Sequence, residues 1–263
     1  MKSRLRTGAP DNGTAMATSM SSGTRALPGD TDTVSRANEA WTPERIAPRI
    51  QHTLIRSTST RDDILQHCRE CLEFGFDAAM VAGTWVPVAA AALRGTPVKV
   101  ASAVDFPLGV MSTTGRVAEA RALVEAGAVE LDITVNIGWL KTGWVRAYRE
   151  DIAAVVAAAR PAAVKVMLEL PLLAPDQRDI AVDQAVAAGV AFVKNASSGA
   201  VGTATESDIR YLRQRAPATV GIKASGGIKG YEQSVGLLEA GADLLGTSAG
   251  LAIVRGETAA ESY

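Results

Sequence analysis

Short apolar runs alternate with helical patterns from about residue 48 onward. Each run is rich in aliphatic and β-branched residues, which is typical of strands buried on both faces. Eight runs fit this description: residues 50–55, 78–82, 98–104, 129–135, 164–170, 192–196, 220–224 and 244–247. Stretches with apolar residues at helical spacing lie between them, at 61–74, 115–126, 145–159, 177–188, 206–215 and 231–240. Several of these end at a glycine, such as Gly75 or Gly189, which favours a helix stop.

Eight strands that alternate with helices over about 210 residues predict a single α/β domain, a (β/α)8 TIM barrel. A doubly wound open sheet is the competing architecture. It usually places a glycine-rich turn after its first strand. Residues 53–57, which read Thr-Leu-Ile-Arg-Ser, contain no glycine, so the pattern favours the barrel.

The two ends of the chain differ from the barrel in texture. Residues 1–44 are rich in Gly, Ser, Thr, Asp and Pro and show no sustained hydrophobic period. This composition predicts a disordered leader. The barrel is expected over residues 45–256, and the short polar segment 257–263 is expected to be a flexible C-terminal tail.

Composition excludes several classes of protein. Of the 263 residues 47% are hydrophobic and 21% are charged, with a net charge of −1, so neither nucleic acid nor an anionic membrane is an expected partner. No stretch approaches the roughly 20 apolar residues of a membrane span. Cys68 and Cys71 form a C-x-x-C inside a helical pattern, without the second pair that a zinc site would need. We interpret them as small apolar helix residues with free thiols, which favours a cytoplasmic location.

Four consecutive strands carry a charged residue where a barrel interior favours aliphatic ones. These are Asp132, Lys165, Lys194 and Lys223. A structural network of salt bridges would explain one such lysine. Three lysines against one aspartate are harder to explain in this way, unless Glu130 or Glu169 also points inward. The cluster therefore indicates a catalytic site.

The cluster has the composition of an amine nucleophile. Neighbouring strands run about 4.8 Å apart, so Lys194 and Lys223 can approach each other. A nearby like charge and burial both disfavour the protonated form of a lysine, and a neutral amine forms a Schiff base with an aldehyde or ketone. Asp132 is then a candidate proton carrier. The sequence contains no serine-hydrolase elbow, zinc-protease motif or phosphate-binding Walker loop, and we expect neither a metal nor a cofactor.

Glycines follow the last two predicted strands. Gly226 and Gly227 come after the seventh, and the triplet Gly246, Thr247 and Ser248 comes at the end of the eighth. In these barrels, the loops after strands seven and eight commonly bind phosphate through backbone N–H groups. We therefore expect an anion, such as the phosphate of a small sugar, at this end of the barrel.

At these residues the chain resembles the deoxyribose-phosphate aldolase family from about residue 50 to 256. The phrases that carry the resemblance are residues 130–138 with 140–143, residues 192–194, residues 220–228 and residues 246–248. The resemblance implies that Lys194 is the Schiff-base lysine, that Lys223 perturbs it and that Asp132 relays protons. It implies reversible cleavage of 2-deoxyribose 5-phosphate to acetaldehyde and glyceraldehyde 3-phosphate without a metal. Lys165 and the phenol of Tyr263 are accessory candidates, and a homo-oligomer, such as a dimer, is expected.

Departures from the family pattern collect around the predicted substrate pocket. Gln51 stands where the family usually has aspartate, and residues 80–83 and 195–199 differ from its usual phrases. Lys229, a predicted phosphate ligand, replaces an arginine, and Ala249 replaces a serine. Two alternatives therefore stay open. One is the same Schiff-base chemistry on a modified or unphosphorylated sugar, and the other is a non-catalytic barrel that binds a sugar phosphate.

Overall fold

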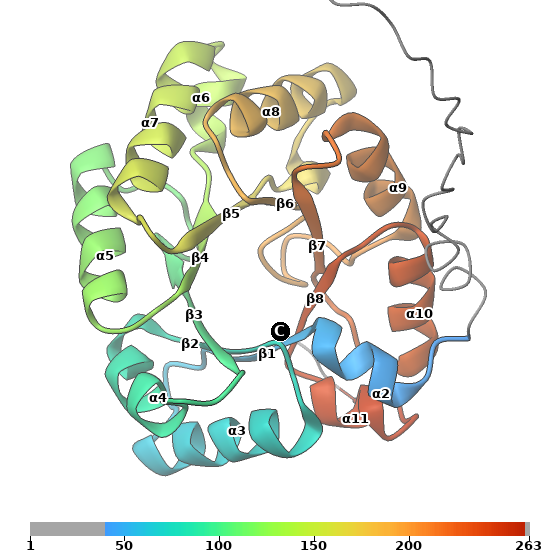
Figure 1. The fold of residues 1–263 in the computed structure, drawn as a ribbon. Coiled ribbons are helices and arrows are strands. Elements are labelled where there is room, and N and C mark those ends of the chain that lie inside the picture. Colours follow the sequence, from blue (N-terminus) through green and yellow to red (C-terminus); the bar gives the residue numbers. More distant parts are fainter. Residues whose placement is uncertain (1–39, 261–263) are drawn as a thin grey trace, which may run out of the picture. The chain divides into compact units, whose positions relative to one another are not determined.

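The computed structural model describes residues 40–260, and eight parallel strands close into a barrel in the order β1 to β8 (Figure 1). The strands are β1 Ile50–Leu54, β2 Ala78–Val81, β3 Lys99–Val104, β4 Glu130–Thr134, β5 Ala163–Met167, β6 Phe192–Lys194, β7 Gly221–Ser225 and β8 Leu244–Thr247. Each strand pairs with the next in sequence, and β8 returns to pair with β1. The predicted (β/α)8 barrel is confirmed.

Helices surround the barrel and cover its outer face (Figure 1). The longer ones are α3 Arg61–Phe74, α4 Val86–Ala92, α5 Thr113–Glu125, α7 Val145–Ala158, α8 Pro175–Ala187, α9 Glu206–Arg215 and α10 Tyr231–Glu239. The short ones are α2 Pro43–Ile46, α6 Ile137–Lys141 and α11 Gly250–Val254, together with the 3-10 turns η2 Ala47–Arg49, η3 Gly83–Trp85 and η4 Leu170–Leu172. The pattern did not predict α4 or the short elements, because one or two turns are too few to show a helical period.

Local signals in the sequence set the ends of helix α3. Thr60 accepts a hydrogen bond from the backbone N–H of Asp63 at 3.3 Å, and the Asp63 carboxylate accepts one from the N–H of Thr60 at 2.8 Å. This reciprocal pair satisfies two N–H groups that a helix start leaves open. Gly75 ends the helix with a φ of 67°, a left-handed conformation that glycine adopts without strain.

Strand β5 ends at Met167, three residues earlier than predicted, and a strained residue follows it. Glu169 has a φ of 54°, in the left-handed region that non-glycine residues seldom adopt. The chain then turns into η4. The sequence could not show this break, because residues 168–170 are apolar at both ends and continue the strand pattern.

A buried arginine of α5 contacts the residue after β3, the last residue of β4 and helix α7. Arg116 donates to Asp105 at 2.8 Å and also bonds Asp151 and the carbonyl oxygen of Thr134. Its guanidinium is desolvated but has acceptors on all three nitrogens, as a buried cation requires. The network links helices α5 and α7 to the ends of β3 and β4.

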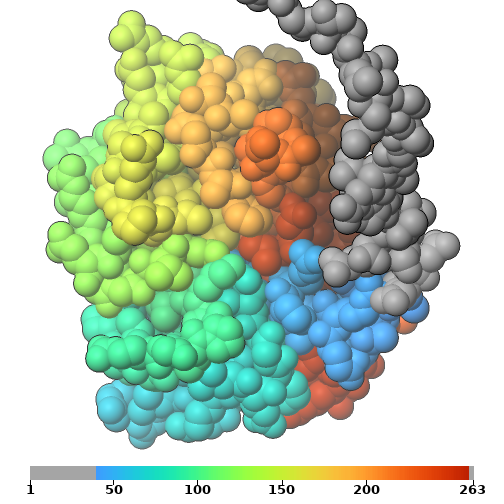
Figure 2. Space-filling view, in the orientation of Figure 1, coloured from blue at the N-terminus to red at the C-terminus, as the bar shows by residue number. Residues whose placement is uncertain are grey.

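The described ends of the chain pack against the last helices. The Tyr231 hydroxyl donates to the carbonyl oxygen of Trp41, and α2 contacts α10 and α11. In Figure 2, the blue atoms of the first described residues lie against red atoms from the end of the chain. The backbone N–H of Ala259 donates to the carbonyl oxygen of Lys229 at 2.8 Å. Tyr263 and residues 1–39 of the predicted leader lie outside the described residues. No helix in residues 40–260 is long and apolar enough to cross a bilayer.

Candidate active site

Buried charges meet inside the barrel, as the sequence predicts. Lys194 on β6 and Lys223 on β7 are register partners, and Asp132 on β4 is the partner of Lys165 on β5. All four side chains are at most 1% exposed. Asp132 contacts lysines of β6 and β7, which are not neighbours of β4, so the four side chains lie on the inner face of the barrel.

Asp132 is the centre of this cluster. Its Oδ2 accepts from Lys223 Nζ at 2.6 Å and from Lys194 Nζ at 3.2 Å, and its Oδ1 lies 3.3 Å from Lys165 Nζ. Burial favours the neutral acid, but the positive charges of the three lysines outweigh burial and hold the pKa of Asp132 well below its usual range. Asp132 is therefore a carboxylate that joins the two lysines predicted to be catalytic.

Further polar groups, which the sequence patterns did not single out, extend the cluster. Gln51 accepts from Lys223 and donates to Asp77 and Glu130, while Lys99 pairs with the same two carboxylates. We call the set the barrel network: Gln51, Asp77, Lys99, Glu130, Asp132, Lys165, Lys194 and Lys223. Lys165 pairs with Glu130 as well as Asp132, and its Nζ lies 5.8 Å from the centre of the Phe192 ring. Lys165 is thus a counter-ion within this network.

Of the two glutamates that could point inward, Glu130 joins the barrel network and Glu169 bonds the loop after β6. Glu130 points inward and joins the barrel network, where Lys165 and Lys99 lower the pKa of its carboxyl although burial alone would raise it. Glu169 is buried outside that hydrogen-bonded set, and both of its oxygens accept the backbone N–H of Ser197 at 3.1 Å. Burial raises the pKa of Glu169. Glu169 thus holds the loop that follows Lys194.

The predicted phosphate residues lie at the neighbouring ends of β7 and β8, where Ser225 pairs with Gly246 and the Thr247 hydroxyl donates to the carbonyl oxygen of Ile228 at 2.7 Å. Gly226 and Gly227 have φ angles of 104° and 59°, and a side chain on Gly226 would collide with the carbonyl oxygen of Gly202. Gly246 is a β8 residue that pairs with both β7 and β1. Lys229 Nζ donates to the carbonyl oxygen of Ala260 at 3.0 Å, so the C-terminal segment holds this lysine.

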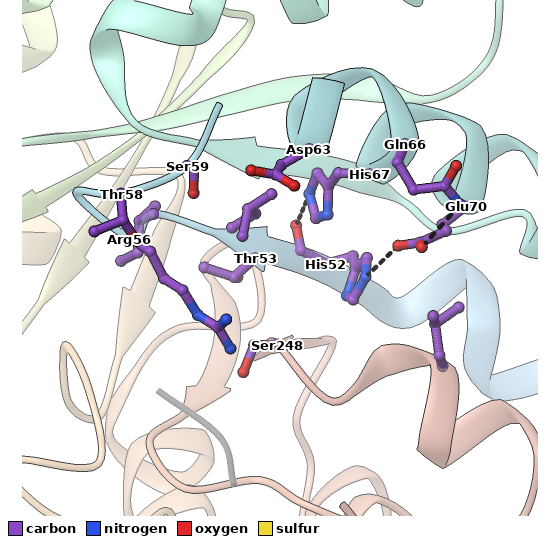
Figure 3. A pocket seen from close by; sticks show the side chains of 13 residues that line it. His52, Thr53, Arg56, Thr58, Ser59, Asp63, Gln66, His67, Glu70 and Ser248 are labelled. Carbon is purple, nitrogen blue, oxygen red and sulfur yellow. Dashed lines mark hydrogen bonds and ion pairs between the residues drawn. The ribbon is translucent and has the colours of Figure 1, made fainter. Parts of the chain in front are cut away.

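Ser248 lines a cavity of about 470 Å³ beside strand β1. Figure 3 shows the Arg56 side chain extending from the loop after β1 toward Ser248. Thr53, Thr58 and Ser59 line the same cavity. The sequence pattern gave no reason to select Arg56. Arg56 and Ser248 line one cavity only because β8 closes onto β1.

His52, His67 and Glu70 lie at another part of this cavity, with one potential metal-ligand atom of each within 4.8 Å of the others. The His52 Nε2 pairs with Glu70 at 3.5 Å, and His67 Nε2 bonds the carbonyl oxygen of His52 at 3.1 Å (Figure 3). The two rings stack with centroids 4.5 Å apart and planes at 25°. Lone pairs of stacked rings lie in nearly parallel planes and do not converge on one ion. Burial lowers the pKa of His67 to about 3, so its imidazole is neutral within this hydrogen-bonded stack.

The two cysteines are buried residues of helix α3, as interpreted from their helical pattern. Both are free thiols. Burial raises the pKa of Cys68 to about 11 and also raises the pKa of Cys71. A buried thiol that keeps its proton behaves as a small apolar residue rather than as a nucleophile.

Curated relatives of this chain are named deoxyribose-phosphate aldolase. The protein from Streptococcus equi subsp. zooepidemicus is 40% identical over 214 residues, which cover 81% of this chain and 97% of the relative. The protein from Carboxydothermus hydrogenoformans is 39% identical over 223 residues, covering 83% and 98%. The solved deoxyribose phosphate aldolase from Aeropyrum pernix, described as a unique tetrameric structure, has a TM-score of 0.76 and 30% identity. It covers 81% of this chain and 91% of its own. No family model matches the sequence.

Proposed function

The chain belongs to the deoxyribose-phosphate aldolase family and is a carbon–carbon lyase, and on this premise we propose that Lys194 is the amine that forms the Schiff base. The reaction is the reversible cleavage of 2-deoxyribose 5-phosphate to acetaldehyde and glyceraldehyde 3-phosphate. One observation carries the assignment of the site. Lys194 and Lys223 share a single carboxylate oxygen of Asp132 inside the barrel.

The chemistry needs an amine and a group that moves protons. The neutral amine of Lys194 attacks the C1 aldehyde, and loss of water from the carbinolamine gives the Schiff base. Removal of the proton on the C3 hydroxyl lets the C2–C3 bond break. C3 becomes the aldehyde of glyceraldehyde 3-phosphate, and the electron pair of the broken bond forms the enamine on Lys194. Protonation at C2 and hydrolysis then release acetaldehyde and return the amine. Asp132, acting through water, carries the protons, and Lys223 favours the neutral form of Lys194 by its positive charge.

Chemical trapping tests this proposal. Incubation with acetaldehyde and borohydride should reduce the Schiff base and leave an ethyl group on Lys194, which peptide mass spectrometry would locate. Borohydride alone serves as the control and should leave the lysine unmodified. An ethyl group on Lys223, or none on any lysine, would contradict the assignment.

Lys223→Leu should shift the pH dependence of kcat/KM to higher pH by at least about one unit. The variant removes the positive charge that shares Asp132 Oδ2 with Lys194, so Lys194 should keep its proton to higher pH. Steady-state kinetics from pH 5 to 10 would measure the shift. Lys141→Leu changes an exposed lysine of α6 and is the matched control. Full activity of Lys223→Leu with an unchanged profile would refute the role of Lys223.

Phosphate should increase kcat/KM by less than about a thousandfold, or roughly 4 kcal/mol. Lys229 supplies a point charge in place of a forked guanidinium and is bonded to Ala260, while Ala249 lacks a hydroxyl. Each hydrogen bond to a charged group is worth about 1.5–3 kcal/mol. The test compares 2-deoxyribose 5-phosphate with 2-deoxyribose. Lys229→Ala and Arg56→Ala would show which cation contributes, and a larger preference would indicate a complete phosphate site.

We further propose that the chain self-associates and acts in the cytoplasm. The Aeropyrum pernix relative is described as tetrameric. Leu108 and Val110 are 72% and 69% exposed and offer apolar surface for a second copy. Light scattering coupled to gel filtration would give the mass of the assembly, and a monomer at micromolar concentration would contradict self-association.

A further inference from the structure

The side chain of Asn195, which directly follows Lys194, is a fully buried link between the ends of β6 and β7. Its Oδ1 accepts from the backbone N–H of Ser225 at 2.8 Å, and its Nδ2 donates to the carbonyl oxygen of Ser225 at 2.9 Å. Ser225 offers one donor and one acceptor, so the two contacts determine the orientation of the amide. Asn195 therefore satisfies both backbone groups of a buried residue of β7.

This link begins where the backbone ladder between the two strands stops. β6 has three residues, and its pairing with β7 ends at Lys194 and Lys223. β7 continues beyond this pair to Ser225. The Asn195 amide supplies at Ser225 the donor and the acceptor that a longer β6 would supply from its backbone. The proposed Schiff-base lysine is thus the last residue of its strand, and a side chain fixes the strand end that carries it.

Backbone contacts around Asn195 hold the same strand end from two sides. The carbonyl oxygen of Asn195 accepts from the N–H of Leu170 at 2.9 Å, which connects it to the turn after β5. The Ser225 hydroxyl donates to the carbonyl oxygen of Ala196. Asn195 therefore joins β6 to the turn after β5 and to the end of β7, directly beside Lys194.

We propose that Asn195 is a positioning residue of the Schiff-base reaction, whose amide holds the end of β6 against β7 and keeps Lys194 Nζ within reach of Asp132. The inference rests on the proposed role of Lys194. The distance at stake is the 3.2 Å between Lys194 Nζ and Asp132 Oδ2, which spans the barrel from β6 to β4. Without the amide, two buried backbone groups of Ser225 lose their partners, and the end of β6 can move away from β7. A displacement of about 1 Å is enough to slow a reaction that depends on the alignment of an amine with its proton carrier.

Two substitutions test the link. Asn195→Ala removes both hydrogen bonds of the side chain. Asn195→Asp keeps the shape of the amide, because the neutral acid can donate to the carbonyl oxygen of Ser225 and accept from its N–H, whereas the ionised carboxylate has no donor. Ser102→Ala is the matched control, because the buried Ser102 hydroxyl also joins neighbouring strands, from β3 to the carbonyl oxygen of Val81 at the end of β2. The readout is the rate at which acetaldehyde and cyanoborohydride label Lys194 between pH 5 and 10, with circular dichroism to confirm folding.

In folded Asn195→Ala, the plateau of the labelling rate should fall about tenfold or more, because the amine is no longer held in place. In Asn195→Asp, the rate relative to the wild type should fall as the pH rises and the new carboxyl loses its proton, and it should stay low at pH 10. A purely electrostatic effect of the new charge on Lys194 would instead shift the acidic limb of the profile and leave the plateau at high pH unchanged. Ser102→Ala should follow the wild type.

A wild-type plateau in folded Asn195→Ala would overturn the inference, and so would a relative rate of Asn195→Asp that is independent of pH or recovers at pH 10. An equal loss in Ser102→Ala would also overturn it, since any broken link between strands would then have the same effect. If Asn195→Ala does not fold, the pH dependence of Asn195→Asp decides the question. These outcomes leave the Schiff base on Lys194 intact, whereas absence of labelling in the wild-type protein would overturn the proposed function together with this inference.

Discussion

Lys194→Met is expected to lower kcat/KM for 2-deoxyribose 5-phosphate by about 10⁴-fold or more, because the variant has no amine to attack the aldehyde. Methionine has nearly the length of lysine and can fill the same space on the inner face of β6. Asp132 keeps Lys165 and Lys223 as partners in this variant, so the fold should persist. Stopped assays for acetaldehyde would measure the loss of kcat/KM, and circular dichroism would show whether the variant is folded.

A neighbouring lysine shows whether the loss of activity is specific to Lys194. Lys165→Met should keep at least about a tenth of the activity, because Lys165 pairs with Glu130 and Asp132 and needs no contact with substrate. If Lys194→Met retained the wild-type rate, or if its activity were lost only through unfolding, the nucleophile would have to be sought elsewhere. Mass spectrometry of the borohydride product would then identify the reacting lysine.

Asp132→Asn should combine the loss of a proton carrier with a large loss of stability. The amide leaves three buried ammonium groups without the carboxylate they share, and breaking a buried ion pair costs about 3–5 kcal/mol. The cost should shrink above about pH 9, where the lysines can lose their protons. Urea unfolding at pH 7 and at pH 10 would measure this difference.

The sign of the wild-type pH dependence follows from the same carboxylate. The pKa of Asp132 is lower in the folded protein than in the unfolded chain, so its stabilising contribution is complete above its ordinary value near 3.8. That contribution is lost as the pH falls through the folded value. Asp62→Asn, at a side chain that is 94% exposed, is the matched control and should change the stability by less than about 0.5 kcal/mol. An equal loss in both variants would contradict the central role of Asp132.

The apolar runs and the helical stretches between them were enough to predict the barrel and to single out the charged residues within its strands. Strands covered on both faces must be apolar, so a lysine or aspartate within such a run is visible in the sequence. Their common inner face was decided by the closed barrel, in which Asp132 contacts lysines of β5, β6 and β7. Their roles came from the family resemblance, because the period treats Lys194 and Lys223 alike.

The partners of these side chains depended on the closed barrel. Gln51 is 172 residues from Lys223 in sequence, and they meet because β8 closes onto β1 and sets their heights. The same closure brings Arg56 beside Ser248. A pattern within one strand contains no information about the register of its neighbours. Tertiary structure alone therefore decided which lysines share Asp132, and that the Gln51 amide lies between Lys223 and the carboxylates of Asp77 and Glu130.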